Sequence, residues 1–259
     1  MRLPKISLVI PSLNKAEFIG RTLQSILDQN YQNLEVIIRD GGSTDGTVEI
    51  IKKFSRKYPA VFFWEIKKDS GQLEAINEGL KNTTGEIVTY LNADDIYRPG
   101  ALIAVGKYFA THPNTPWLVG KGEIVDEEGK IISSFATDYK NFLFSQNKYE
   151  LLLMVNYLMQ PSVFLNRKAY KKYGPFTGTA ASVMEYDLWL KIGKIIMPAI
   201  LDRVLSSFSV YQGSISTSQY KEVLLADERI AEKYTDSALI LMLHYLHNIA
   251  RVIIVKFHI

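Results

Sequence analysis

The sequence has no cysteine among its 259 residues. This absence excludes disulfide bonds, thiolate metal sites and cysteine nucleophiles, and it is typical of a reducing compartment. We also expect no secretory signal peptide, because residues 1–5 lead directly into a strand-like segment without an apolar region and a small-residue cleavage site. We therefore expect a cytoplasmic protein, or one at the cytosolic face of a membrane.

Neither sign of charge dominates. The 30 Lys and Arg residues stand against 27 Asp and Glu residues, which gives a formal net charge of +3 at pH 7. The basic residues are spread along the chain, whereas nucleic-acid binding needs a clustered basic stripe. No nucleic-acid partner is therefore expected. Apolar residues make up 47% of the chain, which suffices for a substantial core.

No apolar run is long enough to cross a bilayer. The most apolar region is residues 237–259, and its longest stretch without Lys, Arg, Asp or Glu is residues 237–250. A membrane-spanning helix needs about 20 such residues. Two interpretations of this tail stay open: an amphipathic helix that lies on a membrane surface, and a helix that packs against its own domain.

The first half of the chain alternates two kinds of hydrophobic pattern. Short apolar runs that predict buried strands are followed by apolar residues at helical spacing; these runs are residues 6–10, 34–38, 61–66 and 87–91. The alternation predicts a mainly parallel sheet with helices on both faces, in which ligands bind beyond the carboxyl ends of the strands. For the less regular second half we predict a hairpin, two helices and one or two final strands, at residues 117–125 with 130–133, 142–158, 187–192 and 201–210.

Polar residues follow the first two predicted strands. Pro11, Ser12 and Asn14 come directly after the first strand, where backbone groups can hold a base or a ribose; a simple turn is the alternative. Residues 40–47 (DGGSTDGT) come after the second strand, and the carboxylate of Asp40 can accept a hydrogen bond from a nucleobase N–H. The glycines of this segment allow tight turning of the backbone near a ligand.

Two further clusters carry paired carboxylates. Residues 92–95 (NADD) follow the fourth strand, and adjacent carboxylates there cost desolvation unless a positive partner is near. Mg²⁺ or Mn²⁺ bridging to a diphosphate is such a partner; the alternative is a solvated turn in which Asp95 caps a helix. Glu185 and Asp187 stand at the start of a predicted helix, where one of them can deprotonate an acceptor hydroxyl. The alternative, acidic residues that complement the helix dipole, suits Asp187 better.

In their order along the chain these segments resemble glycosyltransferase family 2, the inverting enzymes with the GT-A fold. The resemblance covers about residues 5–235, and its motifs lie at residues 7–11, 40–47, 69–72 with 75–77, 85–88, 91–95, 160–164, around Glu185 and at 213–216. It implies an α/β fold, with a GT-A type, Rossmann-like, mainly parallel sheet flanked by helices and a C-terminal helical tail. The implied domain is 1–235, with a nucleotide-binding half of about 1–115, an acceptor half of about 116–235 and an apolar C-terminal helix at 236–259.

The resemblance also implies roles for single residues. Pro11 and Asp40 would hold the nucleotide, with Asp40 facing the base, and Asp69 would help to place the nucleotide or the sugar. Asn92 and Asp94 occupy the two ends of the family's Asp-x-Asp motif, and Asp94 would bind the metal, Mn²⁺ or Mg²⁺. The full set expected to bind the nucleotide-sugar is Pro11, Ser12, Asn14, Asp40, Gly42, Asp69, Gly71, Asn92 and Ala93.

Three positions depart from the family pattern. Asn92 replaces the usual first aspartate, which removes a negative charge from the motif. Glu185 stands where the family usually has its catalytic aspartate; it can make the same proton transfer but reaches one methylene further. Asp187 is therefore kept as a second candidate for the base. Gln212 stands where relatives often have a histidine.

Together these features predict a metal-dependent inverting glycosyltransferase that moves a sugar from a nucleotide diphosphate-sugar to an acceptor hydroxyl. A UDP-sugar is the default donor because UDP is common in the family. We expect a saccharide or lipid-linked acceptor, a role in polysaccharide or glycolipid synthesis, and peripheral membrane association through residues 237–259. Two alternatives stay open: a nucleotide-sugar binding protein without catalysis, and a sugar nucleotidyltransferase, although residues 11–20 supply no basic Gly-rich loop for a triphosphate.

Overall fold

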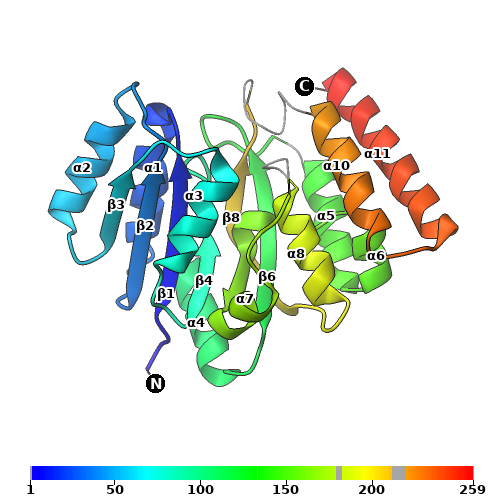
Figure 1. The fold of residues 1–259 in the computed structure, drawn as a ribbon, viewed down its shortest axis with the longest axis horizontal. Helices are drawn as coiled ribbons and strands as arrows, with labels where there is room; N and C mark the ends of the chain where they lie inside the picture. The colour runs from blue at the N-terminus through cyan, green and yellow to red at the C-terminus, as the bar shows by residue number, and fades with distance from the viewer. Residues whose placement is uncertain (1, 133, 179–182, 212–219, 259) are drawn as a thin grey trace.

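A computed structural model of the chain describes residues 2–132, 134–178, 183–211 and 220–258. Within these ranges the strands form one mixed sheet in the order β3-β2-β1-β4-β7-β6-β8-β5 (Figure 1). The strands are β1 Ile6–Ser12, β2 Leu34–Asp40, β3 Phe62–Ile66, β4 Ile87–Tyr90, β5 Ile96–Tyr97, β6 Trp117–Val125, β7 Val163–Asn166 and β8 Ala199–Ser209. The helices are α1 Ala16–Leu27, α2 Thr47–Lys57, α3 Gln72–Lys81, α4 Ala101–Thr111, α5 Ser134–Gln146, α6 Tyr149–Met154, η1 Gln160–Ser162, α7 Arg167–Tyr173, α8 Met184–Gly193, α10 Tyr220–Glu232 and α11 Ala238–His258.

The predicted parallel half of the sheet is confirmed. Strands β3, β2, β1 and β4 lie side by side and run parallel to one another. Every residue of β1, β2 and β4 is buried, as in a parallel sheet covered on both faces, and their apolar residues therefore do not simply alternate with polar ones. Ser12 at the end of β1 pairs in register with Asp40 at the end of β2. The carboxyl ends of the two strands therefore reach the same edge of the sheet.

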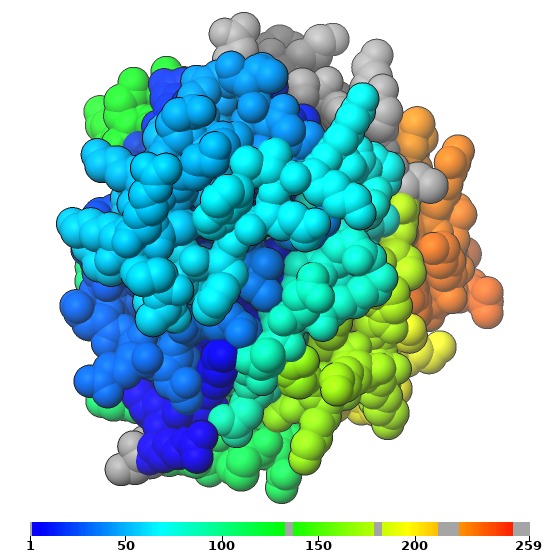
Figure 2. Space-filling view, turned by 60° about the vertical axis from the view of Figure 1, so that its left-hand side comes forward, coloured from blue at the N-terminus to red at the C-terminus, as the bar shows by residue number. Residues whose placement is uncertain are grey.

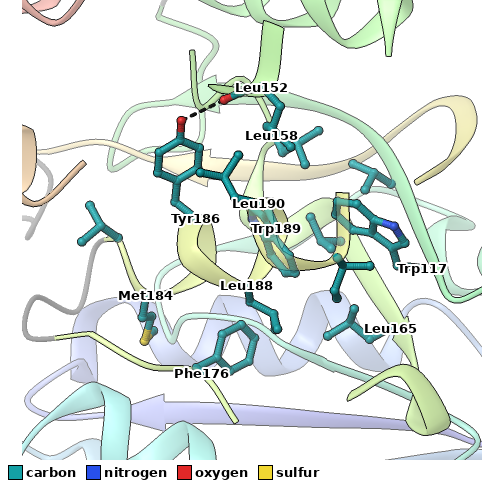
Figure 3. Close-up of a cluster of buried hydrophobic side chains, with 14 of the residues drawn as sticks. Trp117, Leu152, Leu158, Leu165, Phe176, Met184, Tyr186, Leu188, Trp189 and Leu190 are labelled. Carbon is teal, nitrogen blue, oxygen red and sulfur yellow. Dashed lines mark hydrogen bonds between the residues drawn. The ribbon is translucent and has the colours of Figure 1, made fainter. Parts of the chain in front are cut away.

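Two hydrophobic clusters cover the two faces of the sheet. Alternate residues of β1 point to opposite faces. Leu8 packs in the cluster that includes residues of α1 and α4, whereas Val9 packs in the cluster that includes residues of α3 and α8. In the second of these clusters the rings of Trp117 and Trp189 stack at 5.6 Å between centroids (Figure 3). These contacts fix the rotation of α8 and therefore the directions in which its carboxylates point.

The second half of the sheet departs from the prediction. The hairpin predicted for residues 117–125 and 130–133 is wrong as a strand pair, because β6 instead pairs antiparallel with β7 and parallel with β8. Only an isolated bridge between Val125 and Ile131 joins the two expected arms in the described part of the chain, and residue 133 lies outside it. The final strand region is confirmed as β8.

The helix predicted over residues 142–158 is interrupted. Asn147 has a left-handed backbone with φ 45°, a conformation that asparagine tolerates better than most residues. It separates α5 from α6, and its side chain donates a hydrogen bond to the Pro198 carbonyl at 3.0 Å. The helix predicted over residues 187–192 begins earlier, at Met184, so that Glu185 falls within its first turn.

Helix α11 packs on the domain through two buried polar side chains and the partly buried Ile240. It lies against α6 and α10 at one end of the molecule (Figure 1). His244 and Asn248 are buried, and His244 Nδ1 hydrogen-bonds the Leu153 carbonyl at 2.9 Å. The outward side instead carries exposed apolar side chains, namely Leu239, Met242, Leu243, Tyr245, Leu246 and Ile249. In the part of the chain that the structure describes, no helix is both long and apolar enough to cross a membrane.

Candidate active site

A cavity of about 510 Å³ lies beyond the carboxyl ends of the parallel strands, where a ligand is expected in this kind of sheet. The parallel strands lie in the first half of the chain, which forms the face turned to the viewer in Figure 2. Both halves of the chain contribute to the cavity wall. The polar and charged residues of the wall are Ser12, Lys15, Asp69, Gln72, Tyr90, Asn92, Asp94, Lys140, Asn156, Gln160, Glu185, Ser209 and Asp227.

Several residues predicted to bind the nucleotide-sugar line this cavity. Pro11, Ser12, Asp69, Gly71, Asn92 and Ala93 do so. Two buried polar atoms on the wall, Ser12 Oγ and Gln160 Oε1, have no hydrogen-bond partner among the described residues. A buried polar atom without a partner is costly, so these two positions suit a polar ligand that supplies the missing hydrogen bonds.

Asp40 and Asn14 lie beside the cavity rather than on its wall. Asp40 is buried, and its carboxylate accepts hydrogen bonds from the backbone of Gly42 and Ser43 at 3.0 and 2.8 Å and from the Ser43 hydroxyl at 2.7 Å. Asn14 joins the same loop, because its side-chain oxygen accepts from the Thr44 N–H at 2.9 Å. Gly42 has φ 98°, which favours glycine there. In this structure Asp40 shapes the loop, and its contact with a base stays a prediction.

The residues after β4 form a chain of side-chain hydrogen bonds. Gln72 Nε2 donates to Asn92 Oδ1 at 2.6 Å, and Asn92 Nδ2 donates to Asp95 Oδ2 at 3.1 Å. The other oxygen of Asp95 accepts from the Ser209 N–H at 2.9 Å. Burial, with the nearby charge of Asp94 as a second cause, raises the pKa of Asp95 well above its ordinary value. Asp95 is therefore not the solvated helix cap considered above, and it faces β8 rather than the cavity.

Asp94 is the carboxylate of this segment that reaches the cavity. Its Oδ2 atom lies 2.7 Å from Lys15 Nζ and accepts a hydrogen bond of 2.7 Å from the Tyr211 hydroxyl. Neither Lys15 nor Tyr211 is found by the sequence analysis. Lys15 follows a recognised motif directly, but nothing in its sequence context signals contacts with residues 79 and 196 positions away.

Asp94 has the features required of a metal-binding residue, although it is a single carboxylate. Among the described residues, no three His, Asp or Glu side chains gather as a complete metal site. Mg²⁺ bound with a nucleotide typically uses one or two carboxylates, and substrate phosphates and water complete its shell. The Asp94 carboxylate on the wall of an open cavity fits a cation of that kind.

Glu185 lines the same cavity from helix α8. Burial raises the pKa of the Glu185 carboxyl to about 8, and the negative charge of Asp227 adds to the rise. A hydrogen bond from the Tyr90 hydroxyl, 3.4 Å from Glu185 Oε2, and the charge of Lys140 act in the lowering direction. A carboxylate with this raised pKa is a stronger base than an ordinary glutamate and can take a proton from a bound hydroxyl once the pH approaches about 8.

Asp187, the second candidate for the base, is not brought to the cavity. Its carboxylate accepts hydrogen bonds from Thr177 Oγ1 at 2.8 Å and from the Tyr234 hydroxyl at 3.2 Å. It also lies 3.4 Å from Lys233 Nζ. These partners tie α8 to the helix α10 region, which is a structural role. Residues two apart on a helix do not share a face, so only one of Glu185 and Asp187 can line the cavity.

Apart from Glu185, sequence reasoning missed the charged residues that the second half of the chain contributes to the wall. Lys140 of α5 and Asp227 of α10 line the cavity near Glu185. No motif marks either residue, since each stands in a helix of ordinary composition. Gln212 and the segment 213–216 lie outside the described residues.

Comparisons with known proteins agree with this architecture. The sequence model of the family described as glycosyl transferase family 2 matches residues 7–174. A glycosyltransferase of uncharacterised specificity from Rickettsia felis is 27% identical over 223 residues, which cover 85% of this chain and 36% of the relative. A PGL/p-HBAD biosynthesis glycosyltransferase from Mycobacterium bovis is 25% identical over 229 residues, covering 86% of this chain and 84% of that protein.

A solved structure shares the fold. The mannosyltransferase PcManGT from Pyrobaculum calidifontis, in complex with GDP-Man and Mn²⁺, aligns with a TM-score of 0.71 at 21% identity, over 95% of this chain and 71% of that one. At this identity the likeness concerns the fold alone. The chain spans about a third of the length of the relatives from Rickettsia felis, Rickettsia conorii and Rickettsia bellii.

Proposed function

Because this chain belongs to glycosyltransferase family 2, we propose that it transfers a sugar from a nucleotide diphosphate-sugar to an acceptor hydroxyl, with inversion at the anomeric carbon. The main support is one cavity at the carboxyl edge of the parallel strands that holds the carboxylates of Asp94 and Glu185 together. The unpartnered Ser12 and Gln160 oxygens give that cavity sites for a polar ligand.

Glu185 is the proposed base. Its carboxylate takes the proton of the acceptor hydroxyl while that oxygen forms a bond to the anomeric carbon. The bond between the anomeric carbon and the diphosphate oxygen breaks in the same step, and the nucleoside diphosphate leaves with the bonding electron pair. The rigid cavity holds the two substrates in line, which lowers the entropic part of the barrier.

Asp94 is the proposed ligand of a divalent cation, Mn²⁺ or Mg²⁺. When bound, such a cation offsets the negative charge that grows on the leaving diphosphate. Asn92 adds a side-chain amide oxygen to the same cavity wall, and the hydrogen bond that Gln72 donates to this oxygen holds it in place. Pro11, Ser12, Asp69, Gly71 and Ala93 are the proposed donor-binding residues on the cavity wall, and Asp40, Gly42 and Asn14 support them through the neighbouring loop.

The donor and the reaction class are tested together. We expect a UDP-sugar to be the donor, and a panel of UDP- and GDP-sugars with Mn²⁺ would identify it by a rise in the unfolding temperature, since a ligand that binds only the native state stabilises it. Release of nucleoside diphosphate from the same donor, measured with a saccharide acceptor, supports glycosyl transfer. Stabilisation without release would favour a binding protein, and release of pyrophosphate from a nucleoside triphosphate and a sugar phosphate would favour a nucleotidyltransferase.

We further propose that the protein acts in the cytoplasm at a membrane face, in polysaccharide or glycolipid synthesis. Helix α11 buries His244 and Asn248 and exposes apolar side chains such as Leu239, which is 60% exposed. A helix that only packed on its own domain would bury the apolar side. Residues 237–259 include Arg251 and Lys256 and no Asp or Glu, so the helix suits a membrane with anionic lipids.

Vesicle sedimentation tests the membrane contact. Wild-type protein should sediment with vesicles that contain phosphatidylglycerol, and the double variant Leu239→Gln/Leu246→Gln should stay in the supernatant. Phe63→Gln is the matched control, because Phe63 is also exposed but lies on β3 at the other end of the molecule (Figure 1). Equal sedimentation of the wild type and the double variant would contradict the proposal. A dimer in vesicle-free solution that the double variant abolishes would instead assign the helix to a second copy.

A further inference from the structure

Lys15 lies beside one of the two carboxylate oxygens of Asp94, the residue proposed to bind the metal. Its Nζ atom lies 2.7 Å from Asp94 Oδ2 and also hydrogen-bonds the Tyr211 hydroxyl. The same Asp94 oxygen accepts the Tyr211 hydroxyl at 2.7 Å. This oxygen thus has a cation and a phenol as partners, both supplied by the chain itself.

The ammonium group is held by more than this ion pair. Its Nζ lies over the rings of Tyr211 and Phe18, at 5.2 and 5.8 Å from the centroids, and these rings stack on each other at 4.5 Å. The Lys15 N–H donates to Thr47 Oγ1 at 2.8 Å, which fixes the backbone. The ion pair with Asp94 and these ring contacts therefore hold the ammonium group of Lys15 in the cavity wall.

A second cation cannot share that oxygen at the same time. A divalent ion coordinates a carboxylate oxygen at about 2–2.2 Å, which would bring it close to the Lys15 ammonium, and like charges at such a separation repel strongly. Lysine has a flexible four-carbon stem, and Lys15 lines an open cavity with space in front of it. The ammonium can therefore leave Asp94 when another anion offers it a place.

We propose that Lys15 is an internal counter-ion of Asp94 that keeps the metal position closed until the donor arrives, and then binds the donor diphosphate. The inference rests on the proposed function, because it takes the incoming anion to be a nucleoside diphosphate. Lysine binds phosphate as a compact point charge. The protein then takes up metal together with the donor and binds it only weakly in its absence. Lys15 is a positioning and donor-binding residue, and it takes no part in proton transfer.

Metal binding without any nucleotide tests the first half of the proposal. Mn²⁺ affinity is measured by electron paramagnetic resonance for the wild type, Lys15→Met and Lys15→Gln. Both variants should bind Mn²⁺ about tenfold more tightly than the wild type, since a charge-assisted contact that competes with the metal is gone. Lys53→Met is the matched control, because it removes the same charge from an exposed position on α2, and its Mn²⁺ affinity should equal that of the wild type.

Nucleotide binding tests the second half. With Mn²⁺ present, Lys15→Met should bind UDP or GDP about tenfold more weakly than the wild type, while binding of the corresponding nucleoside is unchanged. Equal Mn²⁺ affinity of the wild type and both Lys15 variants, or no Mn²⁺ binding by any of them, would overturn the proposal. Tighter Mn²⁺ binding by the variants with no nucleotide binding by any protein would retain the counter-ion role and would refute the proposed function instead.

Discussion

Two carboxylates face the same cavity, but the charged groups next to them differ in sign. Asp94 lies beside the ammonium of Lys15 and accepts a hydrogen bond from Tyr211. Glu185 lies near a second acid, Asp227, and its Tyr90 contact is longer, at 3.4 Å. Environments that differ in this way are how one site assigns different tasks to chemically similar groups. The Asp94 side is suited to hold positive charge against a diphosphate, and the Glu185 side is suited to accept a proton.

The largest expected effect comes from removing the proton acceptor. Glu185→Gln should lower turnover by about 10²–10⁴-fold, the usual contribution of a general base, and should leave donor affinity nearly unchanged. Steady-state release of nucleoside diphosphate and donor titration measure the two quantities. The matched control is Asp187→Asn, which neutralises a carboxylate of the same helix that lies outside the cavity. If Asp187→Asn lowers turnover by about 10²–10⁴-fold and Glu185→Gln does not, Asp187 is the base and Glu185 is not.

The next effect is on the Asp94 side. Asp94→Asn should weaken donor binding in the presence of Mn²⁺ by about 10–100-fold, because contacts with charged groups contribute about 1.5–3 kcal/mol. The same variant should lose most of its response to added Mn²⁺, while proton transfer by Glu185 is untouched. Titration of a nucleoside diphosphate with and without Mn²⁺ measures this. An unchanged metal response would rule out Asp94 as the metal ligand.

A smaller effect should appear in the pH dependence. Glu185 must be deprotonated to act as a base, so kcat/KM of the wild type should rise with pH through about 8, the raised pKa of Glu185. Tyr90, Asp227 and Lys140 are the titratable groups that act on it. Asp227→Asn removes a neighbouring negative charge, which lowers the pKa of Glu185 and should move the rising limb to lower pH. A limb that keeps its position would show that Asp227 does not act on the base.

The smallest effect concerns stability. The pKa of Glu185 in the folded state, about 8, lies above its ordinary value of 4.5, so folding favours the protonated form. Its contribution to the free energy of unfolding is complete below pH 4.5 and is lost as pH rises through about 8. Glu185→Gln escapes this loss, so its unfolding temperature should gain on that of the wild type between about pH 5 and pH 9, by about 2–4 °C for each kcal/mol lost. If the difference in unfolding temperature between the two proteins were the same at about pH 5 and at about pH 9, the pKa of Glu185 would not be raised.

The first half of the chain could be read from its sequence because its structure follows local patterns. Each parallel strand is rich in apolar residues, and β1 and β2 end in the polar residues Ser12 and Asp40. The position of the cavity follows from that regularity. The choice between Glu185 and Asp187 as the base depends on where α8 begins, at Met184, and on how α8 packs. The spacing of residues along the sequence gives neither.

The rest of the site depends on contacts between distant segments. Lys15, Tyr211 and Asp94 meet only in the folded chain, across sequence separations of 79 and 117 residues from Asp94. Asp227 reaches the cavity because α10 packs beside α8. The break at Asn147, a left-handed residue inside an apolar stretch, was likewise hidden, because asparagine is also tolerated within helices. No local pattern encodes such contacts.

A crystal structure of the protein with Mn²⁺ and a nucleoside diphosphate tests the central claim most directly. The diphosphate should lie in the cavity with the metal on the Asp94 carboxylate, Lys15 Nζ moved from Asp94 to a phosphate oxygen, and Glu185 facing the space left for the acceptor. A nucleotide bound elsewhere on the molecule, or bound in the cavity out of reach of both Asp94 and Glu185, would contradict the account.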